Sequence, residues 1–327
     1  MHVKPPTVPK LDKLDWRILY ELDRNASQSL AEIGKRLHVG RDVMHYRVKR
    51  LERERIIKNY ITIIDYGKIG YMSGSIYLKL QHDTPEIQEE IMNYFKNDPR
   101  VWWLSFRDGN YDIALTWWAK DIVELKEAEK NLLAKYRKYF KEIKTRPYNS
   151  LTIFPRNYFI NWERKKTDSF VIKTKVEKIT NEDDERILAL IAENARLSYV
   201  EIANKLKLSA AQVFYKLKLL REKKIILGSR AVIDCELLGY QWFKIDFYLD
   251  DFTQAEKIYS YVASHPNVVY AYDSLGGADV EFEVEVKNYD ELLTIENEIK
   301  KRFGDSIRYT EHYMFFKEQK ILYFPSF

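Results

Sequence analysis

The side chains best suited to binding another molecule lie between positions 41 and 50. A helical stripe of Met44, Val48 and Leu51 predicts the inward face of one helix. Its outward face and flanks carry polar and charged side chains: Arg41, Asp42, His45, Tyr46, Arg47, Lys49 and Arg50. Such side chains hydrogen-bond to base edges and phosphates, so the pattern predicts a helix that contacts double-stranded DNA.

Two further helices must hold this helix in place. Ile18 and Leu22 belong to the apolar stripe of the first, and Ser29 with Glu32 forms a capping box that begins the second. A short break at 38–40 separates the second helix from the third. Three short helices with a tight turn before the last are typical of a helix-turn-helix.

The whole unit occurs twice. The segment from Asp15 matches the segment from Asp184 at an offset of 169 residues, without a gap, as far as Gly70 and Gly239. Beyond that point the offset slips by two, and the match continues through the following α/β region. We therefore expect two copies of one structural unit.

The third helices of the two copies differ in their outward side chains. Copy two presents residues with few hydrogen-bond donors for bases: Ala211, Phe214, Tyr215, Lys218 and Leu219. We predict that copy one specifies the DNA sequence, and that copy two mainly adds nonspecific contacts to phosphates through Lys216 and Lys218.

The charge of both segments supports contact with phosphates. Residues 34–60 contain nine basic and three acidic residues, and residues 203–229 contain seven and one, which gives +6 in each. Charged helix faces are also common on solvated surfaces, and some helix-turn-helix proteins bind no DNA. The same excess on the same helix in both copies favours the DNA interpretation.

After each helical region the apolar period shifts toward two. Copy one predicts strands at 75–80, 101–106, 111–119 and 150–154, with helices at 85–97 and 123–140. Copy two predicts strands at 243–249, 268–273, 279–286 and 310–316, with helices at 253–265 and 289–303. The order βαββαβ predicts a four-stranded antiparallel sheet with helices on one face, an α+β fold.

The other face of each sheet needs cover. We expect the copies to pack sheet against sheet, within one chain, between chains, or both. The tryptophans of copy one's central hairpin make it apolar on both faces and favour a buried partner: Trp102, Trp103, Trp117 and Trp118.

The second α/β region is acidic. Residues 231–327 contain nine basic and eighteen acidic residues, and Glu281, Glu283 and Glu285 share one face of a strand. This pattern predicts an acidic surface that would repel DNA and suit a protein or cationic partner, or simply serve solubility.

Composition and motifs limit which compartments, cofactors and membrane segments the sequence allows. Cys235 is the single cysteine of 327 residues, which excludes an intrachain disulfide and fits a cytoplasmic location. No sequence motif for a metal, a cofactor or a phosphate-binding loop stands out, and no apolar run is long enough to span a membrane. The first ten residues contain three prolines and predict a flexible arm.

The sequence resembles the Lrp/AsnC family, also called feast/famine regulators. The resemblance is carried by residues 11–71, by their weaker relative at 184–240, and by the turn Arg107-Asp108-Gly109-Asn110-Tyr111-Asp112. It implies winged helix-turn-helix domains, each followed by a ferredoxin-like (RAM/ACT-like) effector domain, in a prokaryotic transcription regulator that self-associates through sheet faces. The tandem length departs from the usual single unit, so one chain could imitate the usual dimer.

The resemblance also implies an effector, an amino acid in that family. The family's Gly-x-Tyr-Asp turn lies near its effector site, and Gly109, Tyr111 and Asp112 match it, whereas copy two keeps Gly276 and Asp279 only. A plain turn between strands explains these glycines equally well.

Two other functions stay open. Sirohaem decarboxylases resemble the same unit and occur as fused pairs, although the histidine of their turn is absent here. A module that senses an effector or binds a protein, but no longer DNA, is the second alternative. A DNA-binding regulator that is not an enzyme is the favoured interpretation.

The predicted domains follow from these boundaries. The helix-turn-helix domains cover 11–62 and 181–231, the α/β effector and assembly domains cover 63–160 and 232–327, and a basic linker at 161–180 carries one short strand at 170–176.

Overall fold

The capping signals of the sequence begin the helices of both helix-turn-helix units. In the computed structural model, which describes residues 9–161 and 169–325, the Ser29 and Ser198 hydroxyls accept the backbone N–H groups of Glu32 and Glu201, whose carboxylates bond back to the capping residues. The helices of copy one are α1 (Lys13–Arg24), α2 (Leu30–Leu37) and α3 (Arg41–Arg53). Those of copy two are α6 (Glu182–Glu193), α7 (Tyr199–Leu206) and α8 (Ala210–Glu222).

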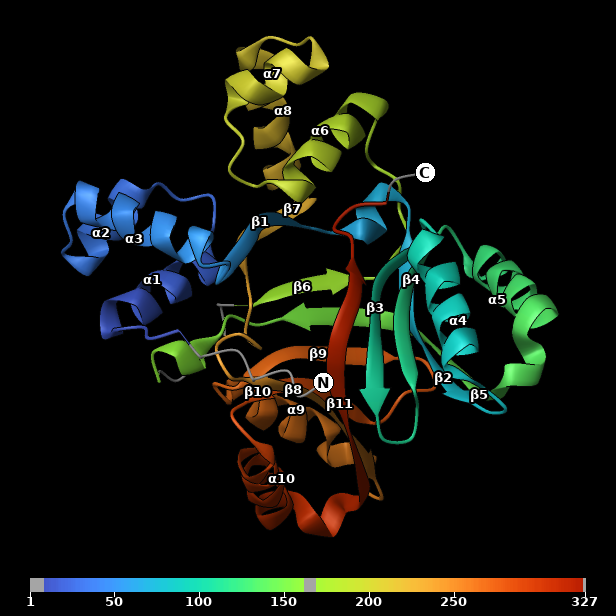
Figure 1. Cartoon of the computed structure of the whole chain (residues 1–327). Helices are drawn as coiled ribbons and strands as arrows, with labels where there is room; N and C mark the ends of the chain where they lie inside the picture. The colour runs from blue at the N-terminus through green and yellow to red at the C-terminus, as the bar shows by residue number, and fades with distance from the viewer. Residues whose placement is uncertain (1–8, 162–168, 326–327) are drawn as a thin grey trace.

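The strand after each helix-turn-helix unit pairs with its counterpart from the other copy. Strands β1 (Ile57–Ile64) and β7 (Ile226–Ile233) form a two-stranded antiparallel sheet. Helix α1 packs on β7 and α6 packs on β1, so each unit rests on a strand of the other copy. Figure 1 shows the two units standing on either side of this pair.

The α/β regions follow the predicted βαββαβ order. Copy one contains β2 (Met72–Leu80), α4 (Pro85–Asn97), β3 (Val101–Asp108), β4 (Ile113–Ala119), α5 (Ile122–Tyr136) and β5 (Phe140–Ile153). Copy two contains β8 (Gln241–Leu249), α9 (Ala255–Ser264), β9 (Val268–Ser274), β10 (Val280–Val286), α10 (Tyr289–Phe303) and β11 (Ile307–Ile321). Short 3-10 helices lie at η1 (Tyr66–Ile69), η2 (Arg137–Tyr139), η3 (Asn157–Phe159), η4 (Phe252–Gln254) and η5 (Gly304–Ser306).

The last strand of each copy is much longer than the sequence predicts, and each joins both sheets. The first half of β5 pairs with β2 and its second half with β9, whereas β11 pairs first with β8 and then with β3. The strands therefore close a circuit, β2-β4-β3-β11-β8-β10-β9-β5 and back to β2. Figure 1 shows β11 running between the two groups of strands.

Part of the predicted linker belongs to this sheet. Strand β6 (Phe170–Lys173) pairs with the end of β5 at Ser150–Ile153. The remaining linker residues 162–168, and residues 1–8 of the predicted arm, lie outside the described residues.

Helices cover the outer faces of the strands, and the inner faces meet each other. The outer faces are apolar, with Leu78 and Leu115 in one core and Ile245 and Phe282 in the other. The two sheets thus pack face to face within one chain. Self-association of the chain remains a prediction, and in the described part of the molecule these inner faces are already covered.

The inner faces are unusually polar, and here one sequence prediction is wrong. Glu281, Glu283 and Glu285 do not form an acidic surface, because they are only 1%, 4% and 4% exposed and point between the sheets. Buried cations of copy one compensate most of this charge: Arg146 contacts Glu281, and Arg156 contacts Glu285. The sequence shows the alternation of the strand but not that a second charged sheet covers it.

Candidate DNA interface and internal cavity

Helix α3 exposes the predicted DNA-contacting side chains. Met44, Val48 and Leu51 are buried, as the helical stripe predicts, and the opposite face is open to solvent. Arg41, Asp42 and His45 are exposed there, together with Tyr46, which is 63% exposed. Within the described part of the chain, Arg41 and His45 form no side-chain hydrogen bond or ion pair. This face can donate hydrogen bonds to a duplex without breaking contacts of the fold.

Two of the predicted residues instead hold α3 against α1. Arg47 Nη1 lies 2.5 Å from Asp12 Oδ2 and 2.9 Å from Asp15 Oδ1, and Arg50 Nη2 lies 2.5 Å from Asp15 Oδ2. The hydrogen bond from Arg47 lowers the pKa of Asp12. These two arginines therefore have a structural role. Only the N–H groups that do not bind Asp12 or Asp15 are left to contact phosphate.

Helix α8 of copy two presents a less polar face. Phe214 is 50% exposed and Tyr215 is 60% exposed, while Val213, Leu217 and Leu220 are buried. The two cations predicted here differ in their surroundings. Lys216 lies 3.3 Å from Asp184 of α6, and the Lys218 side chain is 58% exposed, with Glu222 3.8 Å away.

The predicted effector residues lie in the turns that join the central strands of each sheet. Gly109 and Gly276 adopt positive φ angles of +122° and +71°, which glycine tolerates best. Asp112 accepts the backbone N–H of Leu80 at 2.7 Å, and Asp279 accepts that of Leu249 at 2.6 Å. Both carboxylates thus tie the turn to a neighbouring strand.

Tyr111, the remaining predicted effector residue, is buried. Its hydroxyl donates to Glu142 at 3.0 Å, and its ring packs near Tyr77 and Tyr313. The turn of copy one therefore reaches one end of the space between the sheets.

A cavity of about 350 Å³ lies between the two sheets, beside the β1 and β7 pair. Sequence reasoning did not identify it. The walls combine aromatic rings with buried charges from both copies. The aromatic and charged lining residues include Tyr148, Arg156, Arg230, Trp242, Tyr270, Tyr272, Glu283 and Glu285.

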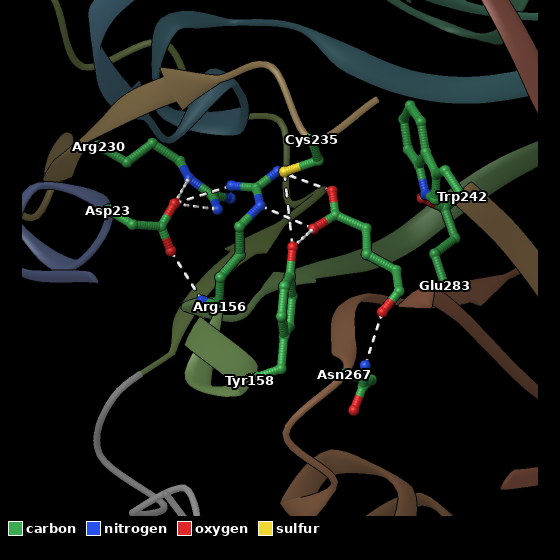
Figure 2. A network of polar contacts seen from close by, with 9 residues as sticks. Asp23, Arg156, Tyr158, Arg230, Cys235, Trp242, Asn267 and Glu283 are labelled. Carbon is green, nitrogen blue, oxygen red and sulfur yellow. Dashed lines mark hydrogen bonds and ion pairs between the residues drawn. The ribbon is translucent and has the colours of Figure 1, made fainter. Parts of the chain in front are cut away.

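A buried ionic network joins this cavity to the first helix-turn-helix unit (Figure 2). Arg156 Nη1 lies 2.8 Å from Asp23 Oδ1 of α1, and its Nε lies 2.7 Å from Glu285 Oε2 of β10. Arg230 of β7 also contacts Asp23, at 2.6 Å, and the Tyr158 hydroxyl donates to Glu285. Burial acts to raise the pKa of Asp23, but the charges of Arg230 and Arg156 outweigh it and lower that pKa.

The network was not predicted from the sequence, although the alternation of polar residues along two strands indicated it. Polar residues alternate along β10 and also along β8, where Lys244 and Asp246 are buried. Charged residues that alternate on two strands, β8 and β10, indicate a charged interface between sheets, whereas such residues on one strand alone indicate a solvated face. Among the described residues there is no cluster of His, Cys, Asp or Glu that could hold a metal ion.

Comparisons with known proteins agree with this architecture. Residues 11–52 match the AsnC-type helix-turn-helix domain, and residues 181–226 match a winged helix-turn-helix DNA-binding family. An HTH-type transcriptional regulator of Pyrococcus horikoshii is 32% identical over 106 residues, which cover 32% of this chain and 71% of that protein. The regulator Ptr1 of Methanocaldococcus jannaschii is 32% identical over 118 residues, covering 35% and 76% respectively.

The fold of nearly the whole chain resembles that of a protein of known structure. The siroheme decarboxylase NirDL superposes with a TM-score of 0.65 at 15% identity, over 97% of this chain and 94% of that one. At this identity the likeness concerns the fold alone.

The two helix-turn-helix matches and the related regulators support a DNA-binding transcription regulator. The chain belongs to the Lrp/AsnC family, in a tandem form with two copies of the unit. In the described part of the chain, no helix has the length and apolar character needed to cross a membrane.

Proposed function

We propose that α3 of copy one specifies the DNA sequence and that α8 of copy two adds contacts to phosphates. The observation that carries this proposal is the exposed face of α3, where Arg41 and His45 make no side-chain hydrogen bond or ion pair with the described residues. At the position equivalent to His45, α8 exposes Phe214, which offers bases no hydrogen bond. Lys218 supplies a charge for the phosphate backbone.

We further propose that a small effector occupies the cavity between the sheets and alters the position of α1. Arg156 supports this assignment because one guanidinium contacts both Glu285 at the cavity wall and Asp23 of α1. A ligand that competes for Glu285, or moves it, changes the balance of charges on Asp23. The turn residues Gly109, Tyr111, Asp112, Gly276 and Asp279 remain the alternative effector site.

Selection of bound sequences from random duplex DNA tests the assignment of α3. At fixed salt, the wild-type protein should enrich one motif, and a variant with Arg41, His45 and Lys49 replaced by Ala should lose it. The matched control replaces Phe214, Tyr215 and Lys218 of copy two by Ala, which should weaken binding but keep the same motif. Loss of the motif in the control alone would assign the specificity to α8.

A tetrapyrrole-binding enzyme is the second candidate, favoured by the whole-chain fold shared with a siroheme decarboxylase. The cavity opposes it, because no histidine is among the described residues that line it and its buried cations already contact carboxylates. A Soret absorption band in the purified protein, or after addition of an iron porphyrin, would favour the enzyme.

A further inference from the structure

Glu283 is a buried carboxylate that lines the cavity without a counter-ion. Its neighbours on the same face of β10 form ion pairs, since Glu281 contacts Arg146 and Lys244, and Glu285 contacts Arg156. Among the described residues, no basic side chain forms an ion pair with Glu283. Its Oε2 accepts a hydrogen bond from Trp242 Nε1 at 2.9 Å. Figure 2 labels both side chains.

The nearest cation in the sheet is committed elsewhere. Lys244 of β8 lies directly opposite Glu283 in the strand register. Its Nζ, however, contacts Asp246 at 3.2 Å and Glu281. The pairing of the strands therefore leaves Glu283 without an ion pair at the cavity wall.

The remaining cations of the cavity wall also face carboxylates. Arg156 contacts Asp23 and Glu285, and Arg230 contacts Asp23. Lys58, at the edge of the cavity, lies 2.8 Å from Asp234. A ligand carboxylate would have to displace one of these contacts, whereas a ligand cation finds Glu283 unpaired.

Aromatic rings surround this carboxylate. Trp242 packs against Trp103 with ring centroids 5.5 Å apart and against Tyr270 at 6.1 Å, and Tyr148 packs against Tyr272 at 5.1 Å. All five rings line the cavity. Aromatic faces attract cations, and a buried carboxylate strengthens that attraction.

The opposite wall adds a hydrogen-bond acceptor. Thr116 of β4 is 4% exposed and lines the cavity, and its Oγ1 has no hydrogen-bond partner among the described residues. A buried hydroxyl without a partner costs free energy, which an N–H group of a ligand would recover.

We propose that the cavity binds a small organic cation, an amine with a flat apolar part, whose ammonium group pairs with Glu283 between the aromatic rings. The volume of about 350 Å³ suits a ligand of this size. Binding of the amine does not depend on the proposed function, because it can be measured without DNA. Only an effect of the amine on DNA binding would rest on that function.

The protonation of Glu283 supports the same assignment. Burial raises its pKa to about 7, against the lowering effects of Lys244 on β8, Tyr272 on β9 and Trp242. Arg107 on β3 also lowers this pKa. The other charged groups on its own strand are Glu281 and Glu285. Binding of an amine should therefore strengthen as Glu283 ionises from pH 6 to pH 8.

Three indole compounds of different charge test the proposal. Isothermal titration of the full chain at pH 8 compares tryptamine, tryptophan and indole-3-acetate, with phenethylamine as a further amine. We expect the monocation tryptamine to bind more tightly than the zwitterion and the anion. Glu283→Gln keeps the acceptor for Trp242 and should weaken tryptamine binding by about tenfold to a hundredfold and remove its pH dependence. Glu298→Gln, on the exposed face of α10, is the matched control and should bind as wild type.

Other results would overturn the proposal. These are indole-3-acetate binding more tightly than tryptamine, equal tryptamine affinity in Glu283→Gln and wild type, or no saturable binding of any amine. Unfolding of Glu283→Gln is checked by circular dichroism, and Thr116→Val then serves as the second variant, with an expected loss of about threefold to tenfold. Failure of DNA binding would leave these titrations unchanged, so the two proposals fail separately.

Discussion

Arg47 of α3 donates a hydrogen bond to Asp15 of α1, with 2.9 Å between Nη1 and Oδ1. Copy two repeats the contact with Lys216 and Asp184, at 3.3 Å, although the basic residue differs. Asp15 is 1% exposed, so its charge needs a cation from α3. The repeated pair indicates that this position of the third helix serves the packing of the unit before it serves DNA.

Arg47→Ala should therefore lower the free energy of unfolding by about 1–3 kcal/mol, because it removes a charged partner of a buried carboxylate. Chemical denaturation measures the change. Lys49→Ala is the control on the same helix, since its side chain is 75% exposed, and it should stay within about 0.5 kcal/mol of wild type. A stable Arg47→Ala variant that loses its sequence preference would make Arg47 a base-contacting residue instead.

Lys49 and Lys218 should contribute to DNA binding through charge. Replacing either by Ala removes one phosphate contact, so the slope of log affinity against log salt should fall by about one in each variant. Fluorescence anisotropy over a salt series measures the slope. Arg41→Ala should differ from both, with a loss of about 1–3 kcal/mol at one base position of the site. Equal effects of Arg41→Ala on all sequences would argue against base recognition.

Asp23 should govern the acid stability of the chain. Its folded pKa lies below the ordinary range, so its stabilising effect is present above about pH 4 and is lost as the pH falls through the folded pKa. Asp23→Asn leaves Arg156 and Arg230 with one fewer buried counter-ion and should cost about 3–5 kcal/mol at pH 7. Thermal unfolding between pH 2 and pH 7 should show a shallower acid decline for this variant.

The exposed residue Asp305 gives the control for that experiment. Asp305→Asn should follow the wild-type pH curve. A wild-type decline that persists unchanged in Asp23→Asn would assign the acid sensitivity to other carboxylates.

Asp112 and Asp279 should stabilise the fold by similar amounts, whether or not the turns bind an effector. Each accepts a strand N–H, so Asp112→Ala and Asp279→Ala should each lower the free energy of unfolding by about 1–2 kcal/mol. Asp108→Ala, at an exposed position beside the first turn, is the control and should have little effect. If Asp112→Ala kept full stability but changed the response of DNA binding to an amino acid, the turn would be the effector site.

The repeated units could be predicted from the sequence because their signals are local. The capping boxes at Ser29 and Ser198, the stripe through Met44 and the alternation in the central strands depend on neighbours a few residues away. The exposed face of α3 follows from the same stripe. The inward pairing of Arg47 was not predicted, because Asp15 lies on another helix and Asp12 caps that helix.

The length of β5 and β11 shows where local signals fail. The segment 140–149 is largely polar and contains Pro147, and this pattern did not predict a strand. Arg146 is nevertheless 1% exposed, because Asp246 and Glu281 of copy two lie across from it at 2.8 and 3.1 Å. A charged strand can be buried only when a distant strand supplies the opposite charge.

The sequence by itself determined the duplication, the helix-turn-helix units, the βαββαβ order and the basic third helices. The tertiary structure alone decided that the two sheets close on each other, that Glu283 is left without a cation and that Arg156 connects the cavity with α1. Apolar periodicity and capping depend on short-range geometry that any segment carries with it. Charge compensation inside the protein depends on residues a hundred or more positions apart, whose distances only the folded chain sets.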